Sequence, residues 1–421
     1  MQAPSQGSPA AIQQRNARSV VIDGLGVGLV TGVSTFLPVY LVRLGAPPYL
    51  VGLLTALPAF TGILLAIAVG RALERQRNMV PAYSLARSLV QWSYVVMGIV
   101  PFLVDHTLAA WVTVAIWALV TIPQTVVGIT FTVVMGAVVG PGERQALMSR
   151  RWSVLGITSA ITVALVGLVL DRVAFPLNYQ LVFIASFAGG MLSFLASRQI
   201  TIPDNRPPAE DARDGGGMRG IVATLRANPP FGRFVAAAFV FNLGLVMAIP
   251  LFPLYWVRQL GASDAAIGLI NMVNSGIVML GYFVWTALTR RRGNVLVLQI
   301  SAFGLTLYPL LTALASDIAP IVAFAAIAGI FGAGINLVLF DISLATVPAD
   351  KVASSIAVYQ LTTHAATLVA PMIGTFLGDQ LGYGVALLIA AALRLVGAIL
   401  FVALRVGAPE PRPAREGGSD G

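Results

Sequence analysis

Twelve long apolar stretches constrain the fold of this chain more than any other feature of its sequence. They run over residues 19–43, 49–70, 79–104, 108–139, 152–170, 180–197, 232–257, 264–288, 295–315, 319–346, 354–378 and 383–405. A helix that crosses a bilayer needs about 20 mostly apolar residues, because hydrocarbon offers no partner to an unpaired backbone group. The pattern therefore predicts an all-α integral membrane protein with twelve transmembrane helices.

The composition agrees with this prediction and excludes several classes of protein. Only 10% of the 421 residues are charged and 57% are hydrophobic, whereas a soluble domain has about 25% charged residues. The net charge of +9 does not indicate nucleic-acid binding, because so apolar a chain offers no accessible basic face. The chain has no cysteine and two histidines, and no pairing of nucleophile and base is legible. We expect neither enzymatic activity nor a metal or cofactor.

The basic residues predict the orientation of the helices. If the N-terminus is cytoplasmic, the inner segments hold 21 basic residues and the outer loops hold only Arg43, Arg172 and Arg258. Cytoplasmic loops typically carry such an excess, which here requires an even number of spans. We expect a multi-pass protein of the cell's inner (plasma) membrane, with both termini in the cytoplasm. The first apolar run is too long for a signal peptide, so we expect it to remain as a helix.

The two halves of the chain repeat each other. PVYLVR at 38–43 returns as PLYWVR at 253–258, and RALERQR at 71–77 returns as TALTRRR at 286–292, both 215 residues further along. Transporters are often built from such repeats, with the substrate site between them. We expect helices 1–6 to repeat as helices 7–12, in the same orientation, as two six-helix bundles around a central cavity.

A polar segment rich in proline and glycine joins the two halves, and this composition is typical of a flexible linker. Its stretch from Met218 to Ala227 has the two-sided pattern of a short helix at the membrane surface. The expected units are a disordered cytoplasmic N-tail (1–18), an N-terminal bundle (19–197), a cytoplasmic linker (198–231), a C-terminal bundle (232–405) and a disordered cytoplasmic C-tail (406–421).

This organisation resembles that of the major facilitator superfamily, which has two six-helix bundles, a cytoplasmic linker and a basic loop after helices 2 and 8. In the family's loop pattern G-x-x-x-D-R-x-G-R-R, Gly70 and Arg75 match and Glu74 replaces the aspartate, whereas Arg77 and Asn78 depart from the pattern. The resemblance implies a transporter in which helices 1, 4, 7 and 10 line the cavity and helices 2, 5, 8 and 11 flank it.

The resemblance also implies a gate at the cytoplasmic end. Glu74, Arg75 and Arg290 stand where the family's cytoplasmic latch bridges the two halves. Tyr40 and Tyr255 are repeat equivalents at the outer ends of helices 1 and 7. They suit either an outer gate or an aromatic belt at the membrane surface.

Five ionisable residues lie within the apolar stretches: Asp23, Arg87, Asp341, His364 and Arg394. Such groups are costly in hydrocarbon and are therefore candidates for function. Asp23, Asp341 and His364 are candidate proton-coupling groups, although each also suits a structural role, as a cap, a loop tether or a packed core histidine. Arg87 suits snorkelling toward the cytoplasm, and Arg394 suits a structural ion pair or an oligomer contact. The roles of the two arginines stay open.

Polar side chains at helical spacing add further candidates on the helices that line or flank the cavity. Amides carry more weight than serine or threonine, which can bond their own backbone. The candidate substrate-binding or coupling residues are Asp23, Gln124, Asn242, Asn271, Asn274, Asn336, Asp341, Gln360 and His364.

These features predict a proton-coupled secondary active transporter, a monomer in the lipid bilayer, that moves a small organic solute by alternating access. Few charges and many apolar walls favour efflux over uptake, and they argue against phosphate, nitrate or polycarboxylate. The alternatives are a nutrient or metabolite uptake symporter, or an uncoupled facilitator, lipid-handling protein or sensor of the same fold. The departures in the loop pattern motivate the second group, as does a helix 5 without the proline of the family's drug antiporters.

Overall fold

The computed structural model describes residues 9–74, 76, 78–139, 141–202, 228–347 and 352–407. Within these residues, twelve helical spans are long and apolar enough to cross a membrane, and no strand occurs. The predicted fold class is confirmed. The linker stretch from Met218 to Ala227 and residues 408–421 of the expected C-tail lie outside the described residues.

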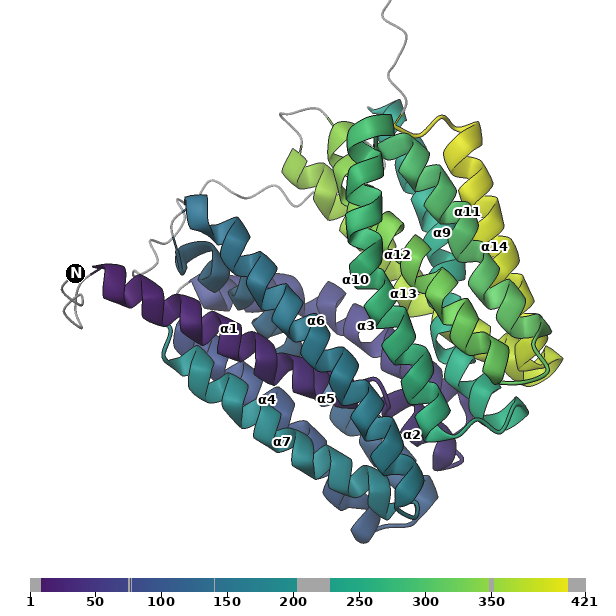
Figure 1. Cartoon of the computed structure of the whole chain (residues 1–421), viewed down its shortest axis with the longest axis horizontal. Helices are drawn as coiled ribbons and strands as arrows, with labels where there is room; N and C mark the ends of the chain where they lie inside the picture. The colour runs from purple at the N-terminus through teal and green to yellow at the C-terminus, as the bar shows by residue number, and fades with distance from the viewer. Residues whose placement is uncertain are drawn as a thin grey trace, which may run out of the picture.

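Six spans form the N-terminal bundle, drawn in purple to teal in Figure 1. They are α1 (Pro9–Ser34) with the short α2 (Leu37–Arg43), α3 (Pro48–Glu74), α4 (Val80–Ile99) with the 3-10 turn η1 (Val100–Phe102), α5 (His106–Ala137), α6 (Pro141–Arg172) and α7 (Leu177–Arg198).

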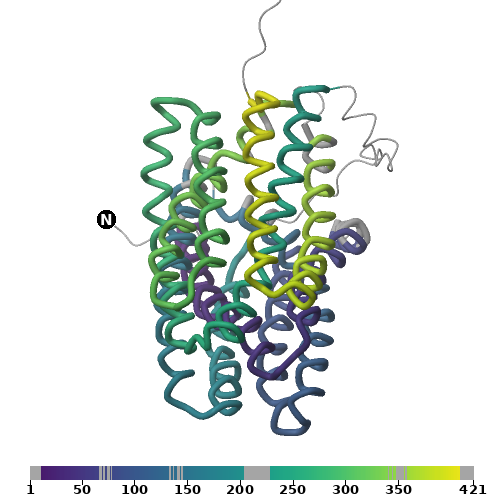
Figure 2. Tube along the Cα trace, turned by 90° about the vertical axis from the view of Figure 1, so that its right-hand side faces the viewer, coloured from purple at the N-terminus to yellow at the C-terminus, as the bar shows by residue number. Residues whose placement is uncertain are grey.

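Six further spans form the C-terminal bundle, drawn in green to yellow. They are α9 (Pro229–Leu254) with the π turn η2 (Tyr255–Gln259), α10 (Asp264–Arg292), α11 (Asn294–Leu314), α12 (Ala319–Ala345), α13 (Val352–Leu381) and α14 (Tyr383–Ala403). In the perpendicular view of Figure 2, the C-terminal half lies above the N-terminal half and the two overlap in the middle.

Local chemistry explains several helix ends. Asp105 caps α5 by accepting a hydrogen bond of 2.8 Å from the backbone N–H of Leu108, and Ser263 caps α10 in the same way through Ala266. Gly293 and Gly382 separate α10 from α11 and α13 from α14 with φ of 83° and 91°. A residue with a side chain rarely adopts this conformation, so both sharp reversals favour glycine.

Two helices begin well before their predicted starts. α1 begins at Pro9, ten residues before position 19, so residues 9–18 are helical rather than a disordered tail. α6 begins at Pro141, eleven residues before position 152. The predicted boundaries marked where the sequence becomes apolar, but a helix can continue past its apolar part. The early start of α6 places Arg151 inside a helix rather than in a loop.

Glycine allows repeat-related helix pairs to pack closely. A Cβ at Gly26 of α1 would lie 2.5 Å from the carbonyl oxygen of Gly189 on α7, and a Cβ at Gly244 of α9 would lie 2.6 Å from the carbonyl oxygen of Ala390 on α14. Such contacts are closer than any side chain permits. The first and sixth spans of each bundle therefore pack backbone against backbone.

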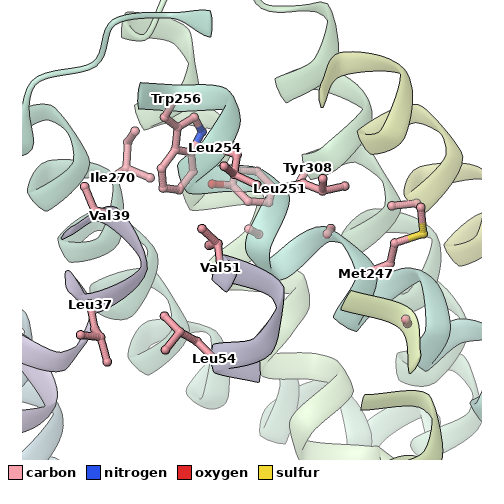
Figure 3. Close-up of a cluster of buried hydrophobic side chains, with 14 of the residues drawn as sticks. Leu37, Val39, Val51, Leu54, Met247, Leu251, Leu254, Trp256, Ile270 and Tyr308 are labelled. Atoms are coloured by element: carbon pink, nitrogen blue, oxygen red, sulfur yellow. The ribbon is translucent and has the colours of Figure 1, made fainter. Parts of the chain in front are cut away.

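The two bundles converge at the end that holds α2 and η2, which we call the closed end, and diverge toward the opposite end, which we call the open end (Figure 1). Figure 3 shows part of the apolar contact at the closed end, where α2 and α3 face α9, η2 and α10. Leu37, Val39 and Leu54 of the first bundle belong to one buried cluster with Leu254 and Ile270 of the second. This cluster gives the closed end a continuous hydrophobic core.

Candidate functional site

Arg43 ties the N-terminal bundle to the C-terminal bundle at the closed end. Its Nη2 donates to the backbone carbonyl of Ala262 at 2.6 Å and lies 3.2 Å from Oδ1 of Asp264. The hydroxyl of Tyr179, in the N-terminal bundle, donates to the same carboxylate oxygen at 2.8 Å. Asp264, the first residue of α10, is therefore held by two groups from the opposite bundle.

Arg258, the repeat equivalent of Arg43, makes the reciprocal contact. Its Nη2 donates to the carbonyl of Ala46 in the N-terminal bundle, while its Nη1 donates to the hydroxyl of Tyr383 at 3.0 Å. Each copy of the P-x-Y-x-V-R sequence thus sends its arginine to the loop that follows the other copy. We call the contacts of Arg43 and Arg258 with the opposite bundle the arginine clasp.

The two tyrosines predicted as gates lie inside their own bundles, beneath the arginine clasp. The ring of Tyr40 lies 5.2 Å from those of Tyr179 and Phe183 in the N-terminal bundle. The hydroxyl of Tyr255 donates to the carbonyl of Ala315 in the C-terminal bundle at 2.8 Å. The tyrosines anchor the two motif copies, and the arginines three residues further on bridge the bundles.

Helices α6 and α10 touch near the closed end and separate toward the open end. A Cβ at Gly167 would lie 2.8 Å from the carbonyl oxygen of Asp264, and a Cβ at Gly268 would lie 3.0 Å from that of Val163. Further along, the same two helices line a cleft of about 1350 Å³, with Ser149 to Ile161 on one side and Ser275 to Arg290 on the other. Among the described residues, α6 and α10 are therefore in contact at one end and parted at the other.

A charge cluster lies within the N-terminal bundle around Asp23, whose side chain is 0% exposed. Arg151 of α6 donates to Oδ2 of Asp23 from Nη2 at 3.0 Å and from Nε at 3.3 Å. Ser193 of α7 donates to Oδ1 at 2.6 Å, and Tyr83 of α4 donates to Oδ2 at 3.3 Å. Nε of Arg87, also on α4, lies 3.5 Å from Oδ1. The carboxylate of Asp23 on α1 thus gathers groups from three other helices, α4, α6 and α7.

The charge cluster corrects two interpretations. Arg87 does not snorkel to the membrane surface; it is 7% exposed and turns inward to Asp23 and to the hydroxyl of Tyr83. Arg151 counted as an inner basic residue in the orientation pattern, yet it is buried. The sequence holds one signal for it, since Pro141 followed by Glu143 is typical of a helix start and would place Arg151 nearly three turns inside α6.

A cavity of about 170 Å³ opens beside the charge cluster, among α1, α4 and α5. We call it the N-bundle cavity. Its polar lining comes from Thr31 and Ser34 of α1, Arg87, Gln91 and Tyr94 of α4, and Gln124 of α5. Of the predicted binding residues, Gln124 therefore borders this cavity. Asp23 does not line the cavity, but it contacts Arg87, which does.

The predicted amides of the C-terminal bundle are engaged in local contacts. Asn271 donates to the carbonyl of Ile267, one turn earlier in its own helix, at 3.0 Å, and Asn274 donates to that of Ala325 on α12 at 3.2 Å. Asn242 of α9 is buried and lies within hydrogen-bond reach of Tyr359. The structure does not bring these amides together with Gln124.

The remaining predicted residues lie apart from one another. Asn336, Asp341 and Gln360 are exposed, and His364 is half-buried. The His364 imidazole faces the N-terminal bundle, because a Cβ at Gly62 of α3 would lie 3.8 Å from its Cε1. His364 is thus the ionisable candidate at the contact between the bundles.

The predicted latch at the open end falls partly outside the described residues. Arg75 and the side chain of Glu74 lie outside them. Arg290 is exposed and lines the cleft between α6 and α10.

Arg394 occupies a different environment from the one expected. It is 3% exposed and donates to the backbone carbonyls of Leu305 at 3.0 Å, Gly244 at 3.2 Å and Leu245 at 3.3 Å. The expected ion pair does not form among the described residues, since their salt bridges involve only Asp23 and Asp264 as acids. Arg394 therefore joins three helices of the C-terminal bundle through their backbones.

The described residues hold no group of three or more histidine, cysteine, aspartate or glutamate side chains arranged to hold a metal ion.

A family model described as the Major Facilitator Superfamily matches residues 30–315 and, in a second match, 234–421. The chain belongs to the Major Facilitator Superfamily. It is accordingly a multi-pass transmembrane transporter.

Solved transporter structures share this fold at low sequence identity. A mutant of the nucleoside transporter NupG has a TM-score of 0.71 and 13% identity, over 93% of this chain and 99% of that one. A bacterial homologue of the iron transporter ferroportin, in an inward-facing state, has a TM-score of 0.71 and 12% identity, over 94% and 99%. A POT family transporter in complex with 5-aminolevulinic acid has a TM-score of 0.71 and 11% identity, over 95% and 97%. No curated protein sequence matches the chain.

Proposed function

We propose that the protein is a proton-coupled secondary active transporter that exports a small organic solute across the cell's inner (plasma) membrane by alternating access. One observation carries the proposal: α6 and α10 touch at the closed end and are parted by a cleft of about 1350 Å³ toward the open end. A carrier must present its site to one side of the membrane at a time, and this arrangement has one open side. The excess of basic residues supports a cytoplasmic open end.

The nature of the closing contacts supports a reversible gate. The side chain of Arg43 in the arginine clasp is 26% exposed, so water can replace some of its hydrogen bonds when the clasp opens. Partly exposed ion pairs contribute little, about 0–1 kcal/mol. Besides its apolar cluster, the closed end is thus held by polar contacts that the protein can release and remake, whereas each bundle is held by close backbone packing.

Cysteine cross-linking tests the alternation, because the chain has no cysteine of its own. Ser149→Cys and Thr286→Cys, combined in one variant, place thiols on opposite sides of the cleft. We expect a disulfide to form only when the open end shuts during turnover. Ser84→Cys with Ser197→Cys is the matched control within one bundle, because these hydroxyls already lie 3.1 Å apart. If the control pair cross-links and the cleft pair never does, alternating access is wrong.

Flux in proteoliposomes under an imposed pH gradient tests the coupling. The coupling candidates are Asp23, Asp341 and His364, and His364 is favoured because it lies between the two bundles. We expect His364→Gln to abolish gradient-driven accumulation. His106→Gln is the matched control, since His106 is exposed at the first position of α5.

A variant with all three candidates neutralised extends this test. If gradient-driven flux is unchanged in the triple variant, the coupling assignment is wrong. A wild-type protein that only equilibrates its solute would be an uncoupled facilitator. Accumulation of solute in the compartment that the open end faces would indicate uptake rather than export.

A further inference from the structure

The charge cluster of the N-terminal bundle carries a surplus positive charge. Asp23 contributes one negative charge, whereas Arg87 and Arg151 each contribute a positive charge, and these are the salt bridges formed around Asp23 among the described residues. A charge inside a membrane-spanning bundle is costly unless it is paired or hydrogen-bonded. One of the two arginines therefore lacks a carboxylate of its own.

The geometry assigns the surplus to Arg87. Arg151 makes two hydrogen bonds to Oδ2 of Asp23, and its guanidinium stacks over the rings of Phe131 at 4.7 Å and Trp152 at 5.0 Å. Arg87 lies 3.5 Å from the carboxylate and makes no hydrogen bond to it; its Nη2 instead donates to the hydroxyl of Tyr83. Each guanidinium keeps one buried nitrogen without a hydrogen-bond partner among the described residues, Nε of Arg87 and Nη1 of Arg151. Arg87, which makes no hydrogen bond to Asp23, is also the arginine that borders the N-bundle cavity.

The rest of the N-bundle cavity suits a small polar group. Thr31 of α1 and Gln124 of α5 line it together with Arg87 of α4. Gln91, which is 5% exposed, also borders the cavity, but its Oε1 lies against Gly190 of α7 and, as an acceptor, offers no hydrogen bond to a carboxylate. The volume of about 170 Å³ is below the roughly 300–1000 Å³ of sites that enclose a drug-sized ligand. The cavity therefore fits one functional group, or a very small solute.

We propose that the N-bundle cavity binds the carboxylate group of the transported solute, with Arg87 as its counter-ion. This inference deepens the proposed function and rests on it. A planar guanidinium matches a carboxylate through paired N–H···O bonds, and one surplus charge balances one carboxylate. A doubly charged phosphate would leave an uncompensated negative charge, and a cation would add to the existing surplus.

Thermal unfolding of the purified full-length protein tests this assignment. The probes are sodium acetate, propionate and benzoate, each compared with its neutral primary amide, and inorganic phosphate in a separate arm. A ligand that binds only the folded protein raises the unfolding temperature. We expect at least one carboxylate to raise it where the corresponding amide and phosphate do not.

Substitutions test whether Arg87 is responsible for the binding of the carboxylate. We expect Arg87→Gln to weaken carboxylate binding at least tenfold and Arg87→Lys to weaken it less, because lysine keeps the charge without the planar fork. Arg172→Gln removes the same charge at an exposed position and should leave binding unchanged. If Arg87→Gln does not fold, Gln124→Leu keeps every charge and should weaken binding several-fold.

Several results would overturn the assignment: no carboxylate stabilises the protein, the amides stabilise it equally, phosphate alone stabilises it, or the Arg87 and Gln124 variants bind as the wild type does. The cross-linking experiment keeps this failure separate from failure of the proposed function. If the open end shuts but no carboxylate binds, the carboxylate site is wrong and the proposed carrier function stands. If carboxylates bind but the open end never shuts, alternating access is wrong and the carboxylate site stands.

Discussion

Removing one arginine of the clasp should lower the free energy that keeps the closed end shut. Arg43→Gln removes a charged hydrogen bond to the carbonyl of Ala262 and an ion pair with Asp264. Hydrogen bonds to charged groups contribute about 1.5–3 kcal/mol, and a partly exposed ion pair less than about 1 kcal/mol. Because Arg43 is partly solvated, we take the low end, about 2 kcal/mol, which corresponds to about a 30-fold shift toward the form with its closed end open.

Labelling of a single cysteine measures this shift. Val39 of α2 is 2% exposed in the apolar cluster at the closed end, so Val39→Cys should react with a soluble maleimide only while that end is open. When opening and closing are fast relative to labelling, the rate is proportional to the open population. We expect about a 30-fold faster reaction in Arg43→Gln, a similar gain in Arg258→Gln, and a further gain when both are changed.

The controls make the result decisive. Arg172→Gln changes the charge at the end of α6, at an exposed position, and should leave the labelling rate within twofold. The disulfide between Ser84→Cys and Ser197→Cys, made in the Arg43→Gln background, reports that the bundle remains folded. If labelling of Val39→Cys does not change in the arginine variants while that disulfide still forms, the arginine clasp does not hold the closed end.

Three further predictions concern the buried charges and the close helix contact. Asp23→Asn should lower thermal stability by about 3–5 kcal/mol, because it leaves two buried arginines without an acid. Adding Arg151→Met should restore part of that loss, and two additive destabilisations in melting experiments would contradict the pairing. Gly268→Leu should accelerate labelling at the closed end, because even a Cβ there would lie 3.0 Å from a carbonyl oxygen of α6; an unchanged rate would mean that α6 and α10 need not touch. Arg394→Met should melt no lower than the wild type, since it removes a desolvated charge without an acidic partner. Arg394→Lys should melt lower, because lysine keeps the charge but lacks the planar guanidinium that reaches three carbonyls. If Arg394→Met melts lower than Arg394→Lys, the charge itself is needed for stability.

The bundles were predictable from the sequence because hydropathy and repetition act over whole helices. The repeated P-x-Y-x-V-R pattern correctly marked two related places at one end of the molecule. It could not show that Arg43 and Arg258 cross to opposite bundles, because that depends on how two bundles dock. Two loops of four residues each, 44–47 and 260–263, receive these arginines, and no periodicity in the chain encodes the contact.

The candidate site was harder to predict, because the helix boundaries and side-chain directions that form it are not encoded in hydropathy. The predicted helix began at residue 152, where the sequence becomes apolar, so Arg151 was assigned to a loop, whereas α6 continues beyond its apolar part. Arg87 turns inward rather than toward water. Asn274 illustrates the opposite error: its polar side chain suggested a binding role, yet a carbonyl of α12 satisfies it. Which neighbouring helix offers that carbonyl follows only from the three-dimensional arrangement.

The reciprocity of the arginine clasp has a consequence for how such a molecule is assembled. Each half supplies both an arginine and a loop carbonyl for the other half, so the clasp is isologous in the sense used for two-fold dimers. Ala262 corresponds to position 47 in the first copy, next to Ala46, so the two acceptors differ by a single position in the repeat. Two copies of one six-helix half, related by a two-fold axis, could therefore form the same contact twice. The closed end is built as a symmetric dimer interface would be, within a single polypeptide.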